Sequence, residues 1–160
     1  MTATKSESLQ AELVRRQRSA ALTVAGFLLL AVALMVIAYF GSQAIFRPGD
    51  PAITMGLWIA ILVFGLGAFV LRRTKFAALR LQDIAAVKGP SGLLKTLQDT
   101  TIQCASIGGA IALMGFIITI RTGDWTNMLR ATSVSLIVLI YCYPFRSAWE
   151  RALIQLAPQE

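Results

Sequence analysis

The stretch that decides the fold is AALTVAGFLLLAVALMVIAYFGSQAIF, residues 20–46, which contains no Asp, Glu, Lys or Arg. Because an α-helix rises about 1.5 Å per residue, about 20 apolar residues are enough to cross the hydrocarbon core of a bilayer. Similar uncharged stretches occupy about 53–71 and 102–120. A fourth, 131–145, is short, and we place its span at about 128–145 by adding Met128 and Leu129.

These stretches predict an all-α integral membrane protein with four transmembrane helices. Lipid offers no hydrogen bonds to backbone groups, so only helices and closed barrels cross a bilayer. Barrel strands would show alternation over roughly 10 residues, which is absent here. A cleaved signal peptide is the alternative for residues 20–46. That stretch is longer than the roughly 7–15 apolar residues typical of such peptides, so we expect it to be retained.

The composition agrees with a membrane protein, since 56% of the residues are hydrophobic and only 14% are charged. Soluble domains carry about 25% charged residues. The composition excludes a disordered tail, a collagen-like chain and a disulfide scaffold. The chain has no His, which removes His-based triads, His-ligated haem and His-bound metals. We therefore expect no catalytic, cofactor-binding or metal-binding residues and no cofactor.

The positive charges predict the orientation. Twelve of the 15 Lys and Arg residues lie before the first span, between the second and third, or after the fourth. The other three are Arg47, Arg121 and Arg130, on the opposite side. Cytoplasmic segments carry the excess of cations, so both termini are predicted to face the cytoplasm, in the inner membrane of a bacterium. The net charge of +7 is thus a topology signal and favours contact with membrane lipid, whereas no nucleic-acid-binding motif surrounds the cations.

A tandem repeat relates the two halves of the chain, which we treat as one membrane domain, 1–160. The paired segments are 31–35 with 110–114, 47–50 with 121–124, and 73–76 with 146–149. They predict two parallel helical hairpins, with repeat unit one at 7–88 and unit two at 91–157. Chance similarity between apolar segments is the alternative. Many transporters use inverted repeats, so a parallel repeat lowers the weight of a transporter.

The repeat includes a predicted hairpin-turn motif, made of Arg47, Gly49 and Asp50 in unit one and Arg121, Gly123 and Asp124 in unit two. Each Arg complements the negative end of a helix dipole. Each Gly suits the left-handed conformation after a helix, and each Asp suits the N-cap of the next helix. We expect a structural role for this motif, with a recognition loop or an ion-binding pair as the alternative.

Small residues on the third span predict a close helix-packing face, comprising Ala105, Gly108, Gly109, Ala112 and Gly115. The partner is either another helix of this chain, which we favour, or another protein. The helices are also expected to extend into the cytoplasm as a short bundle. Residues 74–88 either continue the second helix or lie flat on the membrane as an amphipathic segment. Ser147 to Leu156 is expected to be helical.

Cys104 and Cys142 are the only thiols and are expected near the cytoplasmic edge, which makes contact between them possible. Because the cytoplasm disfavours disulfides, a redox pair, and with it a membrane enzyme, is the least favoured reading. No Asp, Glu, Lys or Arg lies within the uncharged stretches, so an ion pump is also disfavoured.

The leading functional prediction is a non-catalytic multi-pass membrane protein, acting through helix packing as an accessory or scaffold subunit or as a small homo-oligomer. The third span would supply the main contact face. The alternative is a small oligomeric transporter or channel for a neutral or lipophilic solute, in which Thr132, Ser133 and Ser135 would line the path.

Overall fold

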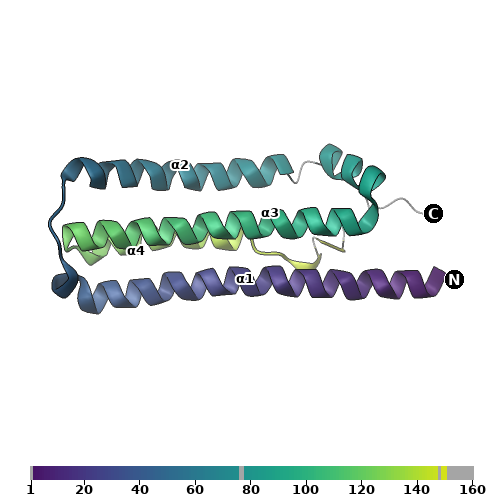
Figure 1. The fold of residues 1–160 in the computed structure, drawn as a ribbon, viewed down its shortest axis with the longest axis horizontal. Helices are drawn as coiled ribbons and strands as arrows, with labels where there is room; N and C mark the ends of the chain where they lie inside the picture. Colours follow the sequence, from purple (N-terminus) through teal and green to yellow (C-terminus); the bar gives the residue numbers. More distant parts are fainter. Residues whose placement is uncertain (1, 76–77, 148, 151–160) are drawn as a thin grey trace.

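The computed structural model describes residues 2–75, 78–147 and 149–150, and this part of the chain is all-helical. Its helices are α1 (Thr2–Ile45), α2 (Pro51–Lys75), α3 (Ala78–Thr122) and α4 (Trp125–Tyr141). α1 and α3 run in one direction and α2 and α4 in the other (Figure 1). We call the end that holds the α1–α2 and α3–α4 turns the hairpin end, and the other the terminal end. The prediction of an all-helical fold is confirmed.

Within the described ranges, three helices are long and apolar enough to cross a membrane: Leu9–Ile45, Pro51–Lys75 and Gly89–Thr122. α4 has 17 residues and ends at Tyr141, not at 145 as predicted. The cause is Pro144, which has no backbone N–H and disfavours helical geometry in the residue before it. Cys142 therefore caps the helix, its N–H bonding the carbonyl of Val138 at 2.9 Å. Membrane residence follows for the chain, and α4 is the shortest of the four helices α1 to α4.

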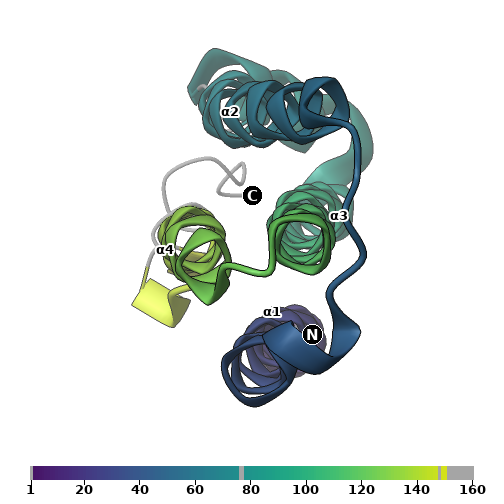
Figure 2. The same ribbon diagram turned by 90° about the vertical axis from the view of Figure 1, so that its left-hand side faces the viewer.

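α3 lies at the centre of the arrangement and contacts each of the other three helices. Viewed along the helices, α1 and α2 lie on opposite sides of α3, although they are consecutive in the chain (Figure 2). α4 packs against α3 and α1 and only slightly against α2. α2 is therefore held mainly by α3, and most of its surface faces outward.

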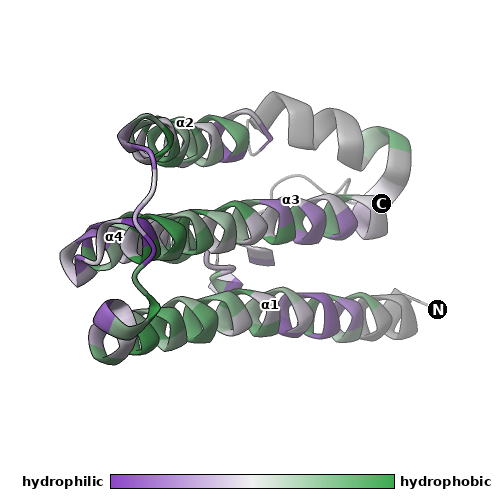
Figure 3. Ribbon diagram, turned by 60° about the vertical axis from the view of Figure 1, so that its left-hand side comes forward, coloured by the Kyte–Doolittle hydropathy of each residue, from purple (hydrophilic) through white to green (hydrophobic). Residues whose placement is uncertain are grey.

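Hydrophobic residues cover the hairpin-end half of α1 and most of α2, whereas hydrophilic residues gather toward the terminal end of α1 and α3 (Figure 3). The exposed side chains of α2 include Met55, Leu62, Leu66 and Val70. A surface of this kind is unfavourable in water and favourable against lipid tails.

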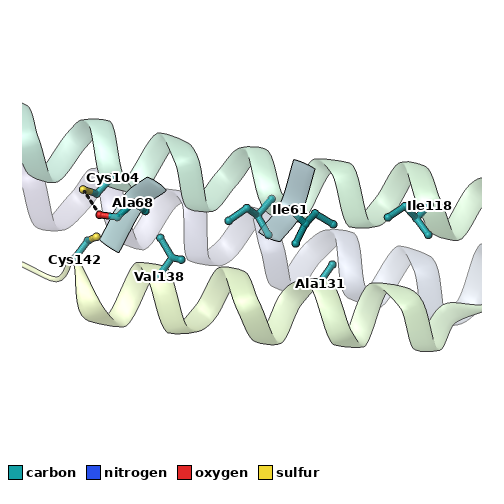
Figure 4. Close-up of a cluster of buried hydrophobic side chains, with 8 residues drawn as sticks. Ile61, Ala68, Cys104, Ile118, Ala131, Val138 and Cys142 are labelled. Atoms are coloured by element: carbon teal, nitrogen blue, oxygen red, sulfur yellow. Dashed lines mark hydrogen bonds between the residues drawn. The ribbon is translucent and has the colours of Figure 1, made fainter. Parts of the chain in front are cut away.

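Three clusters of buried side chains hold the helices together, and the smallest, made of Val24, Ala105 and Leu139, joins α1, α3 and α4. The first joins α2, α3 and α4 and is drawn in Figure 4; its buried members are Ile61, Ala68, Cys104, Ile111, Ile118, Ala131, Val138 and Cys142. The second, the terminal cluster, joins α1 and α3 to the segment after α4 and consists of Leu13, Ala20, Leu93, Leu94, Leu97 and Trp149. Because its residues lie mostly before the uncharged stretches, apolar packing extends beyond the predicted spans.

α3 contains one break, at Gly89, with φ 67° and ψ −176°. Only Gly adopts this backbone conformation readily, and Pro90 follows at the start of the next helical run, where the lack of an N–H costs little. Figure 1 shows 78–88 lying obliquely between the end of α2 and the long part of α3. α2 ends at Lys75 and 78–88 belongs to α3, while residues 76–77 lie outside the described residues. The predicted helix from Ser147 to Leu156 also falls mostly outside them.

Candidate functional site

The two turns at the hairpin end use aspartate in the same way. A side-chain oxygen of Asp50 accepts from the N–H of Ala52 at 2.9 Å, and one of Asp124 accepts from Thr126 at the same distance. The other Asp124 oxygen accepts from the Thr126 hydroxyl at 2.7 Å. These two donors, the hydroxyl first, hold the pKa of the Asp124 carboxyl below its usual value. Both aspartates thus satisfy free N–H groups at a helix start.

The two glycines of the turn motif differ. Gly123 has φ 69°, because Gly123 and Asp124 alone separate α3 from α4 and the chain must reverse sharply. Gly49 does not have a positive φ, so the prediction of a left-handed conformation there is wrong. Residues 46–50 separate α1 from α2, and this longer connection reverses the chain without one. Gly49 lies instead under the Arg121 side chain, where an added Cβ would meet the guanidinium.

The two turns also contact each other. The backbone N–H of Arg47 donates to the carbonyl of Ile120 at 2.9 Å, which caps the end of α3 with the first turn. The Gln43 amide donates to the carbonyl of Gly123 at 3.2 Å. The Tyr39 and Trp125 rings meet edge to face with centroids 5.2 Å apart. Every one of these contacts lies within the chain, and together they fasten the two hairpins to each other.

The small residues of α3 lie against other helices of this chain. A Cβ on Gly109 would overlap the Phe27 ring of α1, and one on Gly115 would overlap the Cβ of Ala131 in α4. Gly108 lies under Leu139, also in α4. Ala105 and Ala112 are fully buried. This face is occupied by α1 and α4, so it is closed to a second protein.

The polar side chains of α4 divide between the core and the outside. Ser135 is buried and its hydroxyl donates to the carbonyl of Gly108 at 2.7 Å. Thr132 is also buried, and its hydroxyl has no hydrogen-bond partner among the described residues. Ser133 is exposed and donates to the carbonyl of Leu129, one turn back in its own helix. Two of the three residues that would line a solute path are therefore packed in the core.

Cys104 and Cys142 are brought together in the cluster of α2, α3 and α4 (Figure 4). Both are free and buried, and the Cys104 thiol lies 3.9 Å from the carbonyl oxygen of Ala68. The burial and the apolar neighbours give these thiols an ordinary packing role.

An apolar groove of about 580 Å³ runs between α2 and α4. Met55, Trp58 and Leu62 line one wall, and Val134 and Ile137 line the other. Farther toward the terminal end α2 and α4 are in direct contact, since Tyr141 stacks on Phe69 with ring centroids 5.1 Å apart and lies 4.4 Å under the Arg72 guanidinium. Gly65 lies in the lining of the groove and has no side chain to fill it. A Cβ added at Gly65 would contact only a methyl group of Val134, at 3.5 Å.

A second depression, which we call the basic pocket, lies at the terminal end of α1 and has a volume of about 1020 Å³. Three of its nine lining residues are cations, Arg15, Arg18 and Arg146, and none is acidic. The Gln17 amide donates to the carbonyl of Pro144 at 3.2 Å, which attaches the segment that carries Arg146 to α1.

Sequence reasoning missed both depressions. The spacing of Arg15, Arg18 and Leu22 on one helix face is a signal for the basic pocket, because residues three and four apart in a helix are neighbours. No sequence pattern predicts that Arg146 joins the pocket, since its position depends on the turn after α4. No pattern predicts the groove either, because α2 is apolar on all sides and none of its faces stands out.

No protein-family model matches this chain, and neither a curated protein nor a solved structure matches it. The class therefore rests on the fold of the described residues, which are all-helical and include three helices long and apolar enough to cross a membrane.

Proposed function

We propose that the chain is a non-catalytic, multi-pass protein of the bacterial cytoplasmic membrane that acts through helix packing as a small homo-oligomer or as a subunit of a larger membrane complex. α4 is the fourth span in this proposal. Its 17 residues, about 26 Å of helix, run along α3 at the same depth, and the Asp caps of α2 and α4 lie at the same end. These features support the tandem-hairpin repeat.

The distribution of cations supports cytoplasmic termini. The terminal end carries most of the described cations. They include Arg15 and Arg18 of α1, Arg73 at the end of α2, Lys95 of α3, and Arg146 after α4. Among the residues that the structure describes, the cations of the hairpin end are Arg47, Arg121 and Arg130. Excess cations mark the cytoplasmic side, so the terminal end faces the cytoplasm in the proposed orientation.

The groove between α2 and α4 is the observation that carries the packing role. α2 is held mainly by α3, and the small-residue face of α3 is already filled within the chain. Helix association in lipid is driven by close packing, and a groove floored by Gly65 admits the side chains of another helix. We therefore assign the contact to this groove, with α2 of a second copy as its occupant. The transporter alternative has less support, because Thr132 and Ser135 are buried in the core.

A substitution that fills the groove tests this proposal. Gly65→Leu places a side chain in the groove, and its Cβ meets only Val134 at an ordinary contact distance. Gly67→Leu is the matched control, because Gly67 is exposed on α2 and an added Cβ meets nothing within 4 Å. The measurement is the mass of each protein purified in a mild detergent, compared with 17.3 kDa for one chain.

We expect the unaltered protein and Gly67→Leu to have the mass of an oligomer, and Gly65→Leu to have that of a single chain. A different protein that co-purifies and is lost only with Gly65→Leu would assign the groove to a heterologous partner and support the subunit form. An unaltered protein that is a strict monomer without a co-purifying protein contradicts the proposal. Equal masses of the Gly65→Leu and Gly67→Leu particles would also contradict it, because the groove would then have no role in the contact between chains.

A further inference from the structure

We propose that the basic pocket binds the phosphate group of an anionic phospholipid. Arg15 and Arg18 reach it from α1, and Arg146 reaches it from the segment after α4. Guanidinium groups bind phosphate oxygens through paired N–H donors, so three of them suit a phosphodiester. The inference rests on the proposed orientation, with the terminal end in the cytoplasm, and is independent of the oligomeric contact.

The adjacent arginines of α1 show why the pocket needs an anion. Arg16 is satisfied within the chain: it pairs with Glu12 at 2.8 Å and donates to the Gln98 side chain at 3.1 Å. In contrast, no hydrogen bond or ion pair within the described residues involves Arg15 or Arg18. Glu12, the nearest carboxylate on this helix, is hydrogen-bonded to Arg16 and to the Ser91 hydroxyl, and it attracts Arg15 without a direct bond.

Arg146 retains donors for a ligand as well. Its Nε pairs with Glu150 at 2.7 Å, and its two terminal nitrogens have no partner among the described residues. Because the Glu150 carboxylate neutralises part of this charge, Arg15 and Arg18 carry most of the positive charge that faces the ligand. Arg146 lines the pocket from the segment after α4.

The apolar part of the lining favours a lipid over a free anion. Val14 and Leu22 line the same pocket and are 43% and 65% exposed. Leu22 lies just inside the uncharged stretch 20–46, and the exposed Leu29 continues its face along α1. A phosphate among the arginines would therefore sit at headgroup depth, with acyl chains against Leu22 and Leu29. Free phosphate has no group that uses this surface.

The test measures lipid retention by native mass spectrometry of the whole chain in an uncharged detergent. Phosphatidylglycerol, phosphatidylcholine and inorganic phosphate are each added, and phosphate is also added in competition with phosphatidylglycerol. The variant Arg15→Gln/Arg18→Gln/Arg146→Gln removes the three cations of the pocket. The matched control Arg73→Gln/Lys75→Gln/Lys95→Gln removes three cations of the terminal end that do not line the pocket.

Each arginine near a phospholipid headgroup strengthens binding about fivefold. We expect phosphatidylglycerol retention to fall on the order of 100-fold in the pocket variant, and to stay within about twofold of the unaltered protein in the control. Phosphatidylcholine is expected to bind weakly to all three proteins. Arg18→Gln alone should lower retention about fivefold, which provides a second measurement if the triple variant does not fold.

Equal losses in the pocket variant and the control would overturn the proposal, because a diffuse positive surface would then account for binding. Inorganic phosphate that displaces phosphatidylglycerol at similar concentration would overturn the lipid as the ligand. The same spectra report the number of chains in each particle. A monomer that retains phosphatidylglycerol therefore supports this inference while contradicting the proposed oligomer.

Discussion

α2 and α3 are both long apolar helices, yet they are buried to very different extents. In the most apolar part of α3, 50% of the residues are buried, compared with 11% in α2. Both contain several glycines. Three glycines in the middle of α3, Gly108, Gly109 and Gly115, lie against side chains of α1 and α4, whereas Gly56 and Gly67 of α2 have open space around them. Apolar composition therefore predicts a span, and the position of small residues relative to other helices decides which span becomes the centre.

The largest expected difference concerns a buried and an exposed aliphatic side chain of the two helices. Leu94 of α3 is fully buried in the terminal cluster, and Val63 of α2 is 59% exposed and does not line the groove. Leu94→Ala should lower the free energy of unfolding by about 2–5 kcal/mol, through lost burial and the cavity left behind. Val63→Ala should change it by less than about 0.5 kcal/mol. Denaturant titration in detergent measures both, and equal losses would contradict the central role of α3.

Glycine-to-alanine changes should have opposite signs in the two helices. Gly115→Ala forces the new methyl against the Cβ of Ala131, so α3 and α4 must separate, at about 1–3 kcal/mol of lost stability. Gly67→Ala meets no neighbour and should stabilise α2 by about 0.5–1 kcal/mol, because alanine has the higher helix propensity. The same titration checks both variants. Destabilisation by Gly67→Ala would mean that α2 packs more closely than described.

The smallest effect concerns the hydrogen bond that joins α3 to α4. Ser135→Ala removes the bond to the carbonyl of Gly108 and should cost about 0.6–1.7 kcal/mol, the range for bonds between membrane helices. Ser133→Ala removes a bond within α4 only and should cost close to nothing. Thermal unfolding in detergent of each single variant and of the double variant separates the contributions of the two serines to stability. A larger loss for Ser133→Ala would indicate that this residue faces a partner.

Local features of the structure were predictable where the cause is local. The Asp50-Pro51 pair indicates a helix start, and α2 begins at Pro51. The small residues of α3 indicate close packing without naming the partner, which is α1 and α4 of the same chain. The conformation of Gly49 was predicted wrongly, because it depends on how far apart the joined helices lie. The end of α4 was also placed too late, although Pro144 was visible as a possible helix breaker.

The basic pocket likewise combines features that the sequence predicts with features that depend on the tertiary structure. Arg15, Arg16 and Arg18 are indistinguishable by charge and by their place before the first span. The tertiary structure separates them, because the Glu12 carboxylate that pairs with Arg16 also accepts from the Ser91 hydroxyl, and Gln98 accepts a further hydrogen bond from Arg16. The contacts of Arg16 with Gln98 and of Glu12 with Ser91 depend on the packing of α1 against α3, which brings residues about eighty positions apart together.

The sequence by itself determined that this protein is helical, where its apolar helices run and which ends carry the positive charge. These properties follow from backbone hydrogen bonds that lipid cannot replace and from charges that stay in water. Only the tertiary structure decided that α3 is central, that a groove lies between α2 and α4, and that Arg15, Arg18 and Arg146 line one pocket. Those outcomes depend on how side chains from distant segments fit together, and close packing of distant segments is a property of the folded whole.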